Sequence, residues 1–357
     1  MATYDLIRDL PVEIDGYELV GLEQPFGPEF VRATTQIELR GGGEAGVGED
    51  VTYDGLDHVT FQAEGKDLPL AGTWTLESFF AHLDEQELWP APPVREPSVL
   101  YRRWAFESAA LDLALRQAGR SLADVLGREA KPLNFVVSMR LSGFEREGPE
   151  NADRVHRMLE RYPGTRFKLD PTNSWTQELI DELAATGKVD TLDLKGFYRG
   201  TPVDVETDPE LYRMCVEGFP DAYLEDPDVT DETKPILDPV ADRVTWDAPI
   251  HTIADVEERP WRPKVINIKP SRVGPLRELF ALYDWAEREG IAVYGGGQSE
   301  LGVGRDHIQY LASIFHPDTP NDTAPGAYNN PDLQESLPQS PLEPRIAATG
   351  FRREQET

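Results

Sequence analysis

The chain has few of the features that would place a protein in a membrane or outside the cell. It contains one cysteine, Cys215, and therefore cannot form an internal disulfide. No run of 18 apolar residues occurs, which argues against a membrane span. The first residues lack the basic start and the apolar core of a secretory signal. We therefore predict a cytoplasmic protein with no membrane partner.

Positive charge is also scarce. The formal net charge of −30 argues against a nucleic-acid partner, because phosphates would be repelled. Such acidity fits a salt-rich cytoplasm and an ordinary acidic protein equally well. Only eight lysines stand against 27 arginines, and three of them, Lys168, Lys195 and Lys269, fall on predicted strand ends. Lysine is the basic residue that can be tuned to release its proton near neutral pH, so these three are candidates for proton transfer.

The 357 residues fit two domains, one of which has barrel size. In residues 1–132 we expect an α+β domain, with strands over 17–26, 30–50 and 59–64 and one helix from Ser98 to Gly127. Strands and helices then alternate through residues 133–330, which predicts a parallel sheet closed into a barrel. The proline-rich segment 331–357 should run back over the surface or over the first domain.

Charged residues close the predicted barrel strands one after another. Asp193, Glu225, Asp247 and Lys269 follow short apolar runs, at steps of 32, 22 and 22 residues. Each step is about one strand plus one helix, so these side chains should meet at one mouth of the barrel. Three acids there suit a hard divalent cation, and a lysine beside them suits proton transfer. Taken singly, each acid could instead be a helix N-cap.

A series of short motifs resembles the enolase superfamily, in its muconate-lactonizing branch with the o-succinylbenzoate synthases and dipeptide epimerases. The barrel motifs, in order, are FKLDP, LDLKG, YLEDP, TWDAP, NIKPSRVG and YGGGQSELGVG, preceded by RRWAFESAALDLALRQAGRSLADVLG. Each is weak alone, and their order and spacing are specific. The resemblance covers nearly the whole chain. It implies a modified (β/α)7β TIM-like barrel with an N-terminal α+β capping domain.

The resemblance also implies roles for the strand-end residues. Asp193, Glu225 and Asp247 would bind Mg²⁺, with Mn²⁺ as an alternative. Lys269 would be an acid/base on one face of a small carboxylate substrate, and Lys168 would lie on the opposite face. The implied reactions of these isomerases and lyases start by removing a proton α to a carboxylate, giving a metal-stabilised enediolate. They end in epimerisation, dehydration or cycloisomerisation. Such α-protons are too weakly acidic for an unaided side chain, and a metal on the carboxylate stabilises the developing charge.

Two positions depart from the family pattern. The family usually carries Lys-x-Lys on the second strand, and here the second lysine is replaced by Asp170. Lys195 stands where the family usually has asparagine. Residues two apart on a strand share a face, so Lys168, Asp170, Asp193 and Lys195 should lie together. Our hypothesis is that Lys195 supplies the missing amine and pairs with Asp170. The alternative is that these residues form a salt bridge that fills the mouth, which leaves Lys269 as the sole active lysine or leaves the protein without catalysis.

The remaining expectations concern the substrate and other partners. Glu300, Gly296 and Gln24 are candidate substrate-binding residues, on the loop after the seventh strand and on a capping loop. The glycine run that includes Gly296 could also cradle a phosphate, which would favour a phosphosugar isomerase-type barrel. The missing second lysine favours a metal-binding homologue without catalysis. The segments around 24–30 and 46–53 match the family's capping loops, and the resemblance implies a homo-oligomer.

Overall fold

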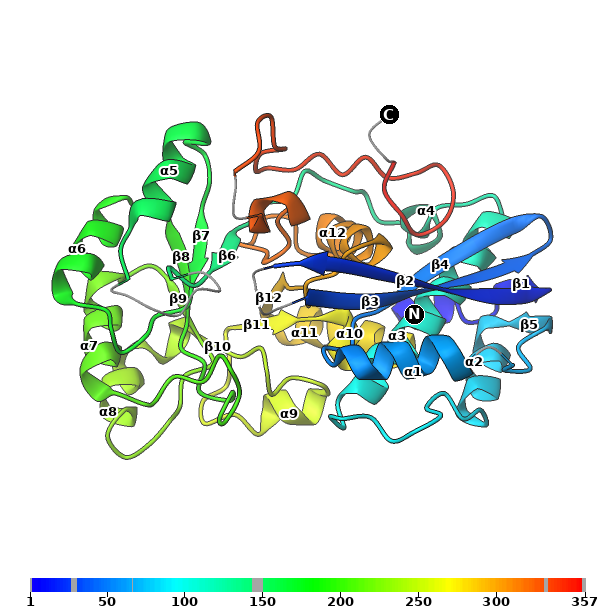
Figure 1. The fold of residues 1–357 in the computed structure, drawn as a ribbon, viewed down its shortest axis with the longest axis horizontal. Coiled ribbons are helices and arrows are strands. Elements are labelled where there is room, and N and C mark those ends of the chain that lie inside the picture. Colours follow the sequence, from blue (N-terminus) through cyan, green and yellow to red (C-terminus); the bar gives the residue numbers. More distant parts are fainter. Residues whose placement is uncertain (1, 27–30, 66, 143–149, 331–332, 355–357) are drawn as a thin grey trace.

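The structure is a computed structural model that describes residues 2–26, 31–65, 67–142, 150–330 and 333–354. Its N-terminal part is α+β and its C-terminal part alternates strands with helices (Figure 1). Among the helices described, none combines the length and apolar character needed to cross a bilayer.

The N-terminal part contains two small antiparallel sheets. One is the pair β1 (Pro11–Ile14) and β5 (Gly72–Thr75); the other is the meander β2 (Gly16–Pro25), β3 (Val31–Gly41) and β4 (Glu44–Asp50). Its helices are α1 (Gly55–Glu64), α2 (Leu76–Asp84), α3 (Ser98–Gln117) and α4 (Leu122–Leu126).

Glycine spacing explains how β4 packs on α3. A Cβ at Gly46 would lie 2.2 Å from the carbonyl oxygen of Ala109, and one at Gly48 would lie 1.9 Å from that of Ala105. Only glycine permits this close approach. Residues 46–50 are therefore a buried strand, and the expectation that they form part of a capping loop was wrong. Residues 27–30 of the other expected capping loop lie outside the described residues.

Two further expectations for this part were wrong. Residues 59–64 belong to helix α1, because Phe61 and His58 turn inward at helical spacing against β3. The helix expected from Ser98 to Gly127 is two helices. Gly119 adopts a φ of 64° after α3, and Ser121 then caps α4 by accepting a hydrogen bond from the Asp124 amide.

The C-terminal part is a ring of parallel strands. Five of them pair in the order β10-β9-β8-β7-β6, and β11 pairs with β12. The strands are β6 (Val137–Met139), β7 (Phe167–Leu169), β8 (Val189–Asp193), β9 (Tyr223–Glu225), β10 (Val244–Thr245), β11 (Val265–Ile268) and β12 (Ala292–Gly295). The helices that follow them are α5 (Asp153–Arg161), α6 (Gln177–Ala185), α7 (Pro209–Gly218), α8 (Lys234–Leu237), α9 (Ile253–Glu257), α10 (Pro270–Val273), α11 (Leu276–Glu289) and α12 (Val303–Phe315).

Three backbone contacts close this ring. The Asn267 amide donates to the Trp246 carbonyl over 3.0 Å, which joins β11 to the end of β10. Parallel bridges then connect Gly296 with Asp322 and Asn321 with Phe135. Residues 321–322 thus act as a very short eighth strand between β12 and β6. The expected (β/α)7β barrel with an α+β cap is confirmed.

The C-terminal segment ties the cap to the barrel. Isolated bridges join Leu342 to Leu133 and Gly350 to Ser121. Phe351 is fully buried and stacks on His307 of α12, with ring centroids 4.2 Å apart. Its ring also packs edge-on against Trp104 of α3.

We expect Phe351→Ala to lower the free energy of unfolding by about 3–5 kcal/mol, because it leaves a cavity between α3 and α12. Urea denaturation followed by circular dichroism measures this loss. The control is Leu56→Ala, whose side chain is 70% exposed and should change stability by less than about 0.5 kcal/mol. Equal stabilities of the two variants would show that the segment does not hold the domains together.

Candidate active site

The predicted barrel residues converge at the carboxyl ends of β7 to β11, which is the mouth of the barrel. Asp193 and Glu225 are the last residues of β8 and β9, and Lys269 directly follows β11. Lys168 lies within β7, and Asp247 comes two residues after β10. All five are buried. The strands that the sequence indicated therefore bring these residues to one end of the ring.

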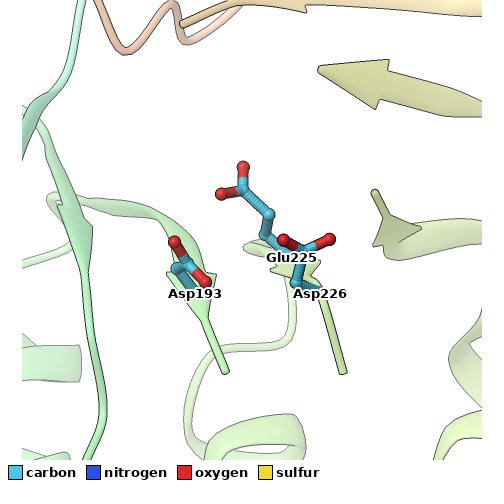
Figure 2. Close-up of side chains that lie close together, drawn as sticks. All are labelled: Asp193, Glu225 and Asp226. Carbon is cyan, nitrogen blue, oxygen red and sulfur yellow. The ribbon is translucent and has the colours of Figure 1, made fainter. Parts of the chain in front are cut away.

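Three carboxylates approach one another most closely. Asp193, Glu225 and Asp226 each place an oxygen within 4.8 Å of the others. Figure 2 shows them rising from the ends of two neighbouring strands around a shared space. Asp247 lies next to this group but outside it, because its carboxylate forms ion pairs with Lys269 and Arg272.

Lys168 fills the centre of the barrel beneath these acids. Its ammonium contacts Glu225 and lies 3.4 Å from both Asp193 and Asp322. Its side chain is only 2% exposed. Burial lowers the pKa of this lysine, but the surrounding carboxylates outweigh burial and raise it well above the usual value. Lys168 is thus held as a cation and is enclosed on several sides.

Lys195 lies nearer the opening. Its ammonium contacts Asp193 and lies 3.2 Å from Asp170, so the pair expected from the two-residue period forms. Its backbone has a φ of 55°, a left-handed conformation that turns the chain at the end of β8. Burial lowers its pKa and the two aspartates raise it further than burial lowers it. The ring of Tyr198 covers the ammonium, with 5.2 Å between Nζ and the ring centroid.

Lys269 approaches the acids from the other side of the ring. Its Nζ is 2.8 Å from Asp247 Oδ2, and Arg272 binds the other oxygen of that carboxylate. Burial alone would raise the pKa of Asp247, but the two basic groups lower it to about 2. Lys195, just after β8, and Lys269, just after β11, therefore flank the carboxylates from two sides.

Asp226 anchors the neighbouring turn. Its two oxygens accept hydrogen bonds of 2.8 Å from the backbone amides of Asp247 and Ala248. Burial, and then the charges of Asp247 and Asp193, raise its pKa to about 7. Burial likewise raises the pKa of Glu225 well above its usual value. Negative charge at this point is costly unless a cation compensates it.

Of the three candidate substrate-binding residues, Gly296 lies at this group and the other two do not. Gly296 lies against Lys269, since a Cβ there would come within 2.6 Å of Lys269 Cε. The close approach of this lysine explains why residue 296 is a glycine, and a phosphate-binding role is not needed to explain it. Glu300 pairs with Arg305 over 3.0 Å, and Gln24 donates to Asn330. Glu300 and Gln24 line a separate cavity of about 1030 Å³ beside the C-terminal segment.

Sequence reasoning missed several residues of the mouth. Asp322 follows the last barrel helix outside any strand motif, and its position became clear only from the closing bridge with Gly296. Asp226 follows Glu225 in the sequence; it binds backbone amides and also lies beside the Glu225 carboxylate. Arg272 could have been found, because it lies three residues after Lys269 on the same short turn.

The donor set fits a divalent cation. Six carboxylates and four basic groups gather here: Asp170, Asp193, Glu225, Asp226, Asp247 and Asp322, with Lys168, Lys195, Lys269 and Arg272. The carboxylates outnumber the basic groups, even when Arg140 beside Asp170 is counted, and all the acidic donors are hard oxygen atoms. Mg²⁺ binds through carboxylates of this kind and keeps some of its waters.

Comparison with known proteins agrees with this arrangement. Residues 129–330 match the family described as "Domain of unknown function (DUF8230) C-terminal domain", and residues 5–125 match its N-terminal domain. An o-succinylbenzoate synthase from Geobacillus stearothermophilus is 26% identical over 307 residues, covering 78% of each chain. An N-succinylamino acid racemase from Thermus thermophilus is 25% identical over 320 residues, covering 85% of this chain and 80% of the racemase.

Solved structures share the fold. A dipeptide epimerase from Methylococcus capsulatus, complexed with Mg ion, superposes with a TM-score of 0.67 at 18% identity, covering 90% of this chain and 92% of the epimerase. A muconate lactonizing enzyme from Pseudomonas putida gives 0.56 at 17% identity, covering 84% and 83%. The resemblance to the enolase superfamily is confirmed. These relatives are enzymes of the isomerase and lyase types, as expected.

Proposed function

The chain belongs to the DUF8230 family, and we propose that it is a Mg²⁺-dependent enzyme that removes a proton α to a carboxylate. The observation that carries the proposal is the placement of Lys195 and Lys269 just after two different strands, on either side of buried carboxylates. This arrangement offers a bound substrate a proton donor or acceptor from two directions.

We assign the cation to Asp193, Glu225 and Asp247. When bound, Mg²⁺ would stabilise negative charge that develops on the substrate carboxylate. Asp226 is closer in space to Glu225, but both of its oxygens already hold the amides that fix the Asp247 turn. We therefore assign Asp226 to positioning of that turn. Asp247, which pairs with Lys269 in this structure, would be the third residue to hold the cation.

Lys269 holds the proton that is exchanged with the substrate. Its neighbours Asp247 and Arg272 fix its ammonium at the mouth, and Gly296 leaves room for its side chain. Loss of the Asp247 ion pair would lower the pKa of the lysine, because that carboxylate is the largest influence opposing its burial. A lower pKa favours the neutral amine, which is the form that accepts a proton.

Lys195, rather than Lys168, serves as the second proton-transfer group in this proposal. Lys168 is buried beneath three carboxylates, while the Lys195 side chain is 11% exposed and lies at the rim. Asp170 replaces the family's second lysine and holds the Lys195 ammonium at 3.2 Å. Asp170 is therefore a positioning residue, and Lys168 compensates the charge of the acids.

We expect Lys195→Ala to lower the rate of α-proton exchange by about 10²- to 10⁴-fold, the usual contribution of a general acid or base. Lys188→Ala at the opposite end of β8 is the control and should leave the rate unchanged. The rate is measured by NMR as loss of the α-proton signal in D₂O. The hypothesis that Lys195 supplies the missing amine would be wrong if Lys195→Ala retained full activity while Lys269→Ala lost it.

The relatives suggest which carboxylates to test. A panel of N-succinylamino acids, dipeptides and muconate follows from what the similar proteins are named for. Proton exchange with inversion would indicate an epimerase, loss of water a dehydratase, and ring closure a cycloisomerase. A protein that binds Mg²⁺ and exchanges no α-proton across this panel would instead be a non-catalytic homologue. The replacement of the family's second lysine by Asp170 is the observation that favours this alternative.

A further inference from the structure

A basic side chain at the rim of the barrel has no acidic partner among the described residues. Arg140 directly follows β6, and the Asp170 amide donates to the carbonyl of Met139 over 3.1 Å. The ends of β6 and β7 are therefore level, and Arg140 lies beside Asp170 at the mouth. Its guanidinium extends over the ends of β7 and β8, because Nη2 donates to the carbonyl of Val203 in the loop after β8, at 3.1 Å.

A second donor of this guanidinium has no partner among the described residues. Arg140 Nε is buried and has no hydrogen-bond partner. Over the part of the chain that the structure describes, no carboxylate comes within ion-pair distance of Arg140. Arg140 is near enough to Asp170 to oppose the rise in the pKa of this carboxyl that burial causes. The basic group that pairs with Asp170 is Lys195.

The contrast with the neighbouring basic groups is clear. Lys168, Lys195, Lys269 and Arg272 each form at least one ion pair with an aspartate or glutamate. The chain has 65 acidic residues, so an arginine at the rim without an ion pair in the described part of the chain is unusual. Buried N–H groups without a partner are rare and costly in folded proteins, and a ligand that supplies the acceptor is one explanation.

We propose that Arg140 binds a second anionic group of the substrate, distant from the carboxylate whose α-proton is removed. This inference rests on the proposed function for the position of the reacting carboxylate. The planar guanidinium donates in a fork that matches a carboxylate, and its contact with Val203 holds the fork in one orientation. The substrate class is thereby narrowed to molecules with two carboxylates, and Arg140 is the residue that distinguishes them from singly charged analogues.

The experiment compares two probes that differ only at the distal group. N-succinyl-L-alanine carries a distal carboxylate, and N-succinamoyl-L-alanine carries an amide in its place. Calorimetric titration in the presence of Mg²⁺ should show the diacid binding about 10- to 100-fold more tightly to the wild-type protein, as expected for a charge-assisted hydrogen bond. Arg140→Gln should bind both probes equally, and Arg140→Lys should retain part of the preference, because it keeps the charge and loses the fork.

Arg213→Gln is the matched control. Arg213 lies on α7 in a solvent-exposed pair with Glu210, and its replacement should preserve the wild-type preference. Equal binding of the two probes by wild type, no binding of either, or an undiminished preference in a folded Arg140→Gln protein would each overturn the inference. If Arg140→Gln fails to fold, equal binding of the two probes by wild type still overturns the inference, and Arg140→Lys tests the role of the arginine. Proton exchange is measured separately, so a binding preference without exchange would contradict the proposed function and leave the role of Arg140 standing.

Discussion

Lys269→Met is expected to reduce α-proton exchange by at least about 10²- to 10⁴-fold. Methionine keeps most of the buried side-chain volume beside Gly296 and removes the amine that lies 2.8 Å from Asp247. Mg²⁺ affinity should be equal or higher in this variant, because Asp247 loses a competing cation. Exchange measured by NMR and Mg²⁺ binding measured by calorimetry therefore separate proton transfer from metal binding.

Lys264→Met is the control for this prediction. Lys264 is exposed and directly precedes β11, at the end of the strand opposite to Lys269. Its replacement should change neither exchange nor Mg²⁺ binding. Exchange at the wild-type rate in Lys269→Met would remove Lys269 from the mechanism and leave Lys195 as the remaining candidate base.

Asp193→Asn is expected to weaken Mg²⁺ binding by more than about 100-fold and to abolish exchange. Changes to groups that merely support a metal ligand cost about 10- to 100-fold, and loss of a charged ligand should cost more. Asp193 is also the shared partner of Lys168 and Lys195, so its loss disturbs both lysines. Asp190→Asn is the control, because Asp190 lies on the same strand and pairs with Arg166 away from the mouth.

The third ligand is tested by a second pair of variants. Asp247→Asn should weaken Mg²⁺ binding about as much as Asp193→Asn, while Asp226→Asn should weaken it by about 10- to 100-fold through the turn that it holds. Calorimetric titration of both proteins decides between them. The reverse order of the two effects would make Asp226 the ligand and Asp247 a partner of Lys269 and Arg272.

The barrel site could be predicted because parallel strands impose a simple rule. Residues that end successive strands meet at one mouth, so Asp193, Glu225, Asp247 and Lys269 were brought together by spacing alone. The pairing of Lys195 with Asp170 was expected from the two-residue period of strands. The pair forms, but Lys195 lies beyond β8 with a φ of 55°, so the turn after the strand places it.

Residues outside such regular elements could not be placed from the sequence. Asp322 reaches Lys168 through a two-residue strand that has no apolar pattern of its own. Arg140 is noticeable only because its buried Nε has no hydrogen-bond partner among the described residues, which a sequence does not display. The family resemblance suggested a capping loop over residues 46–53, whereas Gly46 and Gly48 lie in β4 and permit its close packing against α3.

The central claim is that the buried carboxylates hold Mg²⁺ and that the metal permits removal of an α-proton. Its most direct test is deuterium incorporation at the α-carbon of the carboxylate panel, with wild-type protein in D₂O, measured with Mg²⁺ and again after its removal by EDTA. We predict incorporation with Mg²⁺, none after chelation, and recovery when Mg²⁺ is restored. Incorporation that is equally fast after chelation, or none from a protein shown by calorimetry to have Mg²⁺ bound, would contradict the account.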